Sequence, residues 1–157
     1  MKTLDYISVS SEGANLVSNE LKQLLADLQI FYTNLRGFHW NIKGKQFFQL
    51  HSKFEEMYDD INEKADESAE RMLILGAKPD NRFSEYLKTS KIKEVNDITE
   101  GKEAIKSILD SLKHLISQES KILGIASDAG DESTVAIMSD YIKEQEKMVW
   151  MLTATLS

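Results

Sequence analysis

The sequence of 157 residues contains no cysteine, one proline and only seven glycines. The absence of cysteine excludes disulfide bonds, thiolate metal sites and cysteine nucleophiles, so any metal must be bound by His, Asp or Glu. The scarcity of proline and glycine argues against a β protein with many turns. Together with 29% charged residues, it favours long helices, and we expect an all-α fold.

The sequence also lacks any apolar run of membrane-spanning length. Its first residues make a poor signal peptide, because Lys2 is their only positive charge and Asp5 interrupts the apolar stretch. We therefore expect no membrane association and a cytoplasmic location, or another reducing interior. With 41% hydrophobic residues the chain can bury one core, so we expect a single domain over residues 1–157. The net charge of -7 repels nucleic acid phosphates on average and favours cations.

Four segments carry apolar residues at alternating steps of three and four, the spacing of a helix that buries one face. They predict helices over about 11–38, 46–75, 99–128 and 132–156. Gly76 and Gly130 follow the second and third segments as helix-ending residues, and Asp131 can cap the fourth helix.

The connection between the second and third helices, residues 77–98, lacks a sustained apolar stripe. Phe83, Tyr86 and Leu87 nevertheless predict a short helix within it, and Asp97 followed by Glu100 predicts a capping box for the third helix. Two helical hairpins joined by one long crossover correspond to the ferritin-like version of the four-helix bundle.

The candidate metal ligands lie at the end of the first helix and along the second. The second-helix positions fall at roughly 0°, 40°, 60° and 100° around its axis, so they share one face. This set comprises His39, His51, Glu55, Asp66 and Glu70.

One subunit cannot close a metal site with these ligands, because His51 and Asp66 are about 22 Å apart along the helix. Metal bonds to nitrogen or oxygen are only about 2.0 to 2.2 Å long. If two copies of the helix pack antiparallel about a twofold axis, position i faces position 121 minus i. This register sets His51 against Glu70 and Glu55 against Asp66, and two symmetric sites result. Imidazole and carboxylate ligands of this kind suit Fe(II).

Each acidic residue taken alone is more simply explained as part of a solvated helix face. The same helix also carries Glu56, Asp59, Asp60, Glu63 and Glu67. Spacing alone therefore does not single out the ligands.

The segment from Phe38-His39-Trp40-Asn41 to Asp66-Glu67-Ser68-Ala69-Glu70-Arg71 resembles the ferroxidase signature of the Dps family. In that pattern a second histidine stands twelve residues after the first, and an acidic residue stands four residues after the second histidine. An Asp-x-x-x-Glu pair begins fifteen residues after the second histidine. The resemblance spans nearly the whole chain and includes a late tryptophan, here Trp150. Many relatives have Asp at the position of Glu55, so direct or water-mediated coordination by Glu55 stays open.

The resemblance implies that His39, His51 and Glu55 come from one subunit, and Asp66 and Glu70 from its twofold partner. It further implies a homododecameric shell that oxidises Fe(II), preferentially with hydrogen peroxide, and stores ferric mineral inside, protecting the cell against oxidative stress. One or two irons per site both remain open. Trp40 resembles a residue that intercepts oxidising equivalents, and a packing role is the alternative.

Three other functions are alternatives to this one. An ordinary ferritin or bacterioferritin would need Glu-x-x-His motifs, and the residues three before His39, His51 and His114 are Arg36, Phe48 and Ser111. His114 lies off the apolar stripe and is expected to face solvent. A purely structural helical adaptor would leave the ligand pattern accidental.

The third function is a DNA-binding, nucleoid-protecting Dps whose ferroxidase activity is secondary. Some relatives bind DNA through basic terminal extensions, but residues 1–14 carry only Lys2 against Asp5 and Glu12, and nothing basic follows Lys147. We therefore expect DNA binding to be weak.

Three acids lie around the turn between the last two predicted helices and could line a pore that attracts Fe(II): Asp128, Asp131 and Glu132. Helix capping is the favoured role for Asp131.

Overall fold

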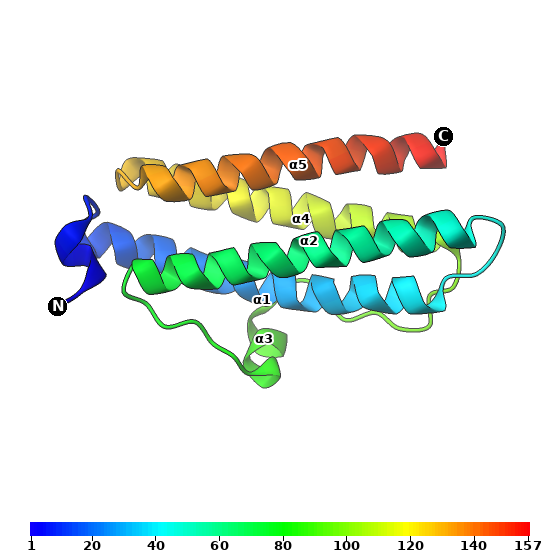
Figure 1. Ribbon diagram of the computed structural model, residues 1–157, viewed down its shortest axis with the longest axis horizontal. Helices are drawn as coiled ribbons and strands as arrows, with labels where there is room; N and C mark the ends of the chain where they lie inside the picture. The colour runs from blue at the N-terminus through cyan, green and yellow to red at the C-terminus, as the bar shows by residue number, and fades with distance from the viewer.

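The apolar stripe of the first segment forms α1 (Ser11–Asn41), which turns back onto α2 (Phe47–Ile74). A second hairpin joins α4 (Gly101–Asp128) to α5 (Glu132–Leu156). The computed structural model describes residues 1–157, and its other elements are a 3-10 turn η1 (Thr3–Tyr6) and the short α3 (Phe83–Thr89). The expected all-α, ferritin-like bundle with a helix in its crossover is confirmed (Figure 1). None of the helices is both long and apolar enough to cross a membrane.

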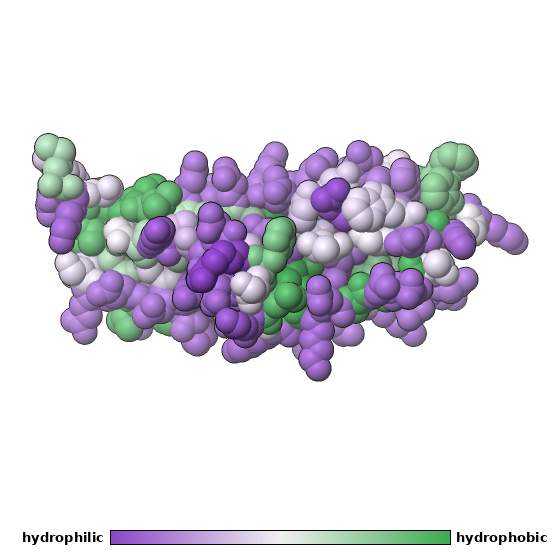
Figure 2. Space-filling view, turned by 90° about the horizontal axis from the view of Figure 1, so that it is seen from below, coloured by the Kyte–Doolittle hydropathy of each residue, from purple (hydrophilic) through white to green (hydrophobic).

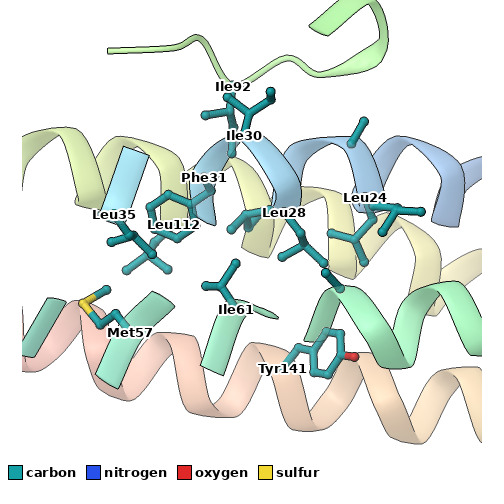
Figure 3. Packing of buried hydrophobic residues seen from close by; sticks show 14 of the residues in the cluster. Leu24, Leu28, Ile30, Phe31, Leu35, Met57, Ile61, Ile92, Leu112 and Tyr141 are labelled. Atoms are coloured by element: carbon teal, nitrogen blue, oxygen red, sulfur yellow. The ribbon is translucent and has the colours of Figure 1, made fainter. Parts of the chain in front are cut away.

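The core lies between the two hairpins and consists of the residues at the three-four spacing. Leu24, Leu28, Phe31 and Leu35 project from α1 toward the other three long helices (Figure 3). They meet side chains that include Met57, Ile61, Leu112 and Tyr141. Because 31 buried residues form one continuous cluster, the long helices are fixed relative to one another and can hold site residues in place.

The crossover runs back along the length of the bundle and is fastened to α1 by buried polar side chains (Figure 1). Asp27, which is fully buried, accepts hydrogen bonds from Lys91 N at 2.7 Å and Ser90 Oγ at 2.9 Å. His114 Nε2 on α4 lies 2.8 Å from Asp27 Oδ2, and its side chain is only 28% exposed. The expectation that His114 faces solvent is therefore wrong. The apolar pattern of α4 could not predict this contact, because the partner of His114, Asp27, lies on α1.

Three of the four expected helix-end signals are confirmed, beginning with Gly76, which has φ +82° just after the C-cap of α2. Gly130 has φ +69° after α4, a left-handed conformation that glycine adopts without steric cost, and Asp131 caps α5 by accepting from Thr134 N. The expected capping box is wrong, because the N-cap of α4 is Glu100 and no side chain caps that helix. Helix α1 also continues three residues past the expected end at Phe38, to Asn41, which brings His39 into its last turn.

Candidate functional site

The two candidate histidines are brought together by the turn between α1 and α2. His39 lies in the last turn of α1, and His51 lies in the second turn of α2. Their rings stack with centroids 3.8 Å apart and planes 16° from parallel. The hairpin therefore places side by side two imidazoles that are twelve residues apart in the sequence.

Each histidine is hydrogen-bonded to the backbone of the other. His39 Nδ1 lies 2.7 Å from the His51 carbonyl oxygen, and His51 Nδ1 lies 2.8 Å from the His39 carbonyl oxygen. A carbonyl oxygen can only accept, so both Nδ1 atoms carry the proton and donate. In the neutral rings Nε2 then holds the free lone pair, and a metal-binding histidine commonly donates its other N–H in this way.

Aromatic side chains restrict both rings further. Phe47 stacks on His51 at 5.0 Å, and the edge of Tyr58 meets His39 at 5.4 Å. Burial and the nearby carboxylates of Glu55 and Asp59 raise the pKa of Tyr58, so its phenol stays neutral. These contacts fix the orientation of the rings before any ligand binds.

The three candidate carboxylates, Glu55, Asp66 and Glu70, are exposed on α2. In the single chain, no group of three or more His, Asp or Glu side chains is close enough together to hold a metal ion. The structure therefore brings His39 and His51 together, but it leaves Asp66 and Glu70 distant on the same straight helix (Figure 1).

Trp40 lies beside the histidines but is not part of the core. Its side chain is 63% exposed, and the Arg36 guanidinium lies 4.6 Å above its ring. Within this chain Trp40 therefore contacts Arg36 at the surface and is not buried in the core. The late tryptophan Trp150 is likewise exposed, on α5.

The three acids considered for a pore are placed differently from one another. Asp128 and Glu132 are exposed, whereas Asp131 is 1% exposed and its Oδ1 lies 2.6 Å from Arg71 Nη2. Asp131 therefore caps α5 and neutralises a buried arginine, and it cannot line an opening.

Sequence patterns missed a polar centre inside the bundle. Lys64 is 4% exposed, and its Nζ lies 2.7 Å from Asp60 and 2.6 Å from Glu144. Glu119 is fully buried behind it and accepts a hydrogen bond from Gln145. Nothing in the sequence pattern distinguishes Lys64 from the exposed lysines, because its partners come from another turn and another helix.

The comparisons with known proteins agree with this architecture. A family model described as the ferritin-like domain matches residues 18–157. A curated relative from Porphyromonas gingivalis, named DNA protection during starvation protein, is 47% identical to this chain. The match covers 98% of this chain and 96% of the relative. The solved structure of the Dps protein from Vibrio cholerae O1 superposes with a TM-score of 0.94 and 49% identity, over 96% of this chain and 94% of that one. The chain belongs to the Dps family.

A second solved structure in this fold group is antigen TpF1 from Treponema pallidum. It superposes with a TM-score of 0.92 and 32% identity, over 96% of this chain and 97% of that one. The Vibrio cholerae Dps protein is described as a member of a broad superfamily of ferritin-like diiron-carboxylate proteins. This chain therefore has the Dps architecture over nearly its whole length.

Proposed function

We propose that this protein oxidises Fe(II) at sites shared between two subunits and stores the ferric product inside a hollow homododecamer. The observation that carries the proposal is the pair of reciprocal Nδ1 hydrogen bonds between His39 and His51, which leaves Nε2 of each ring available to a metal. The diiron-carboxylate chemistry ascribed to the Vibrio cholerae Dps protein supports iron as the substrate.

The complete site would be assembled from two chains. His39, His51 and Glu55 would act from one subunit, together with Asp66 and Glu70 of the partner subunit. The antiparallel pairing of two α2 helices supplies this set, because position i then faces position 121 minus i. The distance between the ligands along one α2 and the absence of a metal-binding group within one chain both support a shared site.

Two neutral imidazoles and three carboxylates provide nitrogen and oxygen ligands, which can bind both Fe(II) and Fe(III). Hydrogen peroxide is the proposed oxidant. Two Fe(II) ions each give one electron to one peroxide molecule, which takes up two protons and leaves as two water molecules. This two-electron reduction releases no hydroxyl radical. Sequestering iron in this way would protect the cell against oxidative stress.

DNA protection is the alternative function, and the Porphyromonas gingivalis relative is named for it. The net charge of -7 weighs against direct DNA binding by this chain. We therefore propose protection through removal of iron and peroxide rather than through coating of DNA.

The deciding experiment is an anaerobic Fe(II) titration of the purified oligomer, followed by one equivalent of peroxide for every two irons. We expect saturable Fe(II) binding and rapid appearance of Fe(III) absorbance, faster than with dioxygen. A His39→Ala/His51→Ala double variant that assembles normally is the matched control and should lose the rapid phase. If the unmodified protein neither binds Fe(II) nor oxidises it faster than this control, the proposed function is wrong.

A further inference from the structure

Two large apolar side chains are exposed at opposite ends of α2. The side chain of Phe48 is 79% exposed and that of Leu73 is 55% exposed. Around the helix axis they lie at roughly 60° and 40° from His51, within the arc occupied by the candidate ligands. The ligand face of α2 is therefore polar in its middle and apolar at each end.

The positions of these two residues agree with the register proposed for the α2 pair. That register was set by the metal ligands, and it pairs residues whose numbers sum to 121. Phe48 and Leu73 also sum to 121, so each would face the other across the twofold axis. An apolar pair at this spacing is an observation independent of the ligands.

The surroundings of Leu73 offer a place for an aromatic ring. An open groove runs beside it, bounded by α1, α2 and the crossover and lined by both polar and apolar side chains. Its lining includes Ala69 and Leu73 from α2, and Pro79 and Tyr86 from the crossover. The crossover forms the middle of the face shown in Figure 2, where hydrophobic patches lie among hydrophilic side chains. The groove also contains Asp66, which places the apolar contact next to a proposed metal ligand.

The charge of the same helix face explains why such contacts are needed. Within the arc centred on the ligands, α2 carries four carboxylates, Glu55, Asp59, Asp66 and Glu70, and no lysine or arginine. Two such faces repel each other when no metal is bound. If the pair forms before metal binds, as we predict, another interaction must hold it together while the sites are empty.

We infer that Phe48 packs against Leu73 of the partner subunit at both ends of the paired α2 helices, and that these two contacts hold the register before metal binds. The inference rests on the twofold pairing in the proposed function. It adds the residues that position the two helices and a reason why the empty site does not separate.

The cysteine-free chain allows a direct test of this contact. The Phe48→Cys/Leu73→Cys variant, oxidised in metal-free buffer, should give disulfide-linked dimers on a non-reducing gel. The matched control is Phe48→Cys/Ile74→Cys, because Ile74 is also exposed but points about 100° away around the helix. We expect at least tenfold less linked dimer from the control. Equal linking in both variants, or linking in neither, would overturn the inferred contact.

A charge exchange tests the energetic role. Phe48→Lys and Leu73→Glu should each weaken assembly. Sedimentation in metal-free buffer should show each variant dissociating into smaller species at a protein concentration about ten times higher than the concentration at which the unmodified chain dissociates. The double variant should recover assembly, because the two new charges are opposite and face each other. Single variants that assemble normally, or a double variant that fails to recover, would contradict the inference. Circular dichroism should show that each variant is folded, because both substituted side chains are exposed in the single chain.

These results separate the inference from the proposed function. Selective cross-linking in a protein that does not oxidise iron would leave the contact standing and remove the ferroxidase. Rapid iron oxidation without selective cross-linking would support the ferroxidase and overturn the contact between Phe48 and Leu73.

Discussion

Gln145 Nε2 donates a 2.7 Å hydrogen bond to Glu119 Oε1 in the interior of the bundle. The other oxygens of the pair, Glu119 Oε2 and Gln145 Oε1, have no hydrogen-bond partner. Two unpartnered acceptors are unfavourable, but a proton on Oε2 makes that oxygen a donor. Burial raises the pKa of Glu119 to about 8, against the opposing effects of Gln145 and Lys64, so the neutral acid is the dominant form at neutral pH.

This relationship predicts that Glu119 makes the fold less stable as pH rises. The folded pKa of about 8 exceeds the ordinary value of 4.5, so the stabilising contribution is complete below 4.5 and is lost as pH rises through 8. Glu119→Gln should remove this dependence. Relative to the unmodified chain, the variant should gain up to about 4 kcal/mol between pH 5 and 9, because the difference between the two pKa values spans about three pH units within that range.

The measurement is the midpoint of thermal unfolding at fixed protein concentration at pH 5, 7 and 9. Glu146→Gln, at an exposed position on the same helix as Gln145, is the matched control and should follow the unmodified chain. A Glu119→Gln profile parallel to that of the unmodified chain would show that Glu119 does not titrate as described.

The buried pair of Arg71 and Asp131 predicts a large stability effect. Asp131 accepts from Arg71 and from Thr134 N, so Asp131→Ala would leave a buried guanidinium unpaired and α5 uncapped. We expect a loss of about 3 to 5 kcal/mol for the unpaired charge, and about 1 kcal/mol for the cap. Asp131→Asn should lose less because it can still cap the helix. Glu132→Ala, at the exposed neighbouring position, should change unfolding by less than about 0.5 kcal/mol in the same denaturation assay.

Complementation tests the shared site. His51→Ala and Asp66→Ala subunits should each form nearly inactive oligomers, because every site loses one ligand. In a mixed twofold dimer one site receives both defects and the other receives none. Co-expressed, co-assembled variants should therefore recover peroxide-dependent Fe(II) oxidation. Verified co-assembly without recovered activity would show that the ligands do not divide between two subunits.

Assembly is predicted to be complete without iron. Twelve copies of the 17.9 kDa chain give a particle of about 215 kDa, which light scattering can distinguish from a dimer. We expect this mass at micromolar concentration in metal-free buffer. A dominant monomer or dimer would contradict the proposed shell.

Duplex DNA binding is predicted to be weak near neutral pH. An acidic protein has few ways to release the counterions of phosphate, which supply most non-specific affinity. Mobility-shift assays in metal-free buffer should show little retardation at physiological salt. Tight binding that weakens steeply with added salt would reveal a basic surface formed between subunits.

Local sequence patterns were sufficient to predict the helices and the residue types of the candidate metal ligands. The apolar spacing of residues 11–38 predicts α1 because a helix repeats every 3.6 residues, which is a local property of the chain. Gly130 and Asp131 likewise mark a helix end through their own backbone and side-chain preferences. The motif around His39 and His51 led to the Dps family, which the comparisons establish over nearly the whole chain.

The contacts between polar groups, in contrast, could not be predicted from local sequence patterns. The bond between His114 and Asp27 joins residues 87 apart, and Asp131 meets an arginine 60 residues earlier in the chain. Such partners depend on how the helices pack, which no local pattern records. The reciprocal bonds of His39 and His51 arise in the same way, because the turn must first bring the two helix ends together. The carboxylates of Asp66 and Glu70 stay unpaired with those histidines within one chain, since a straight helix holds them too far away.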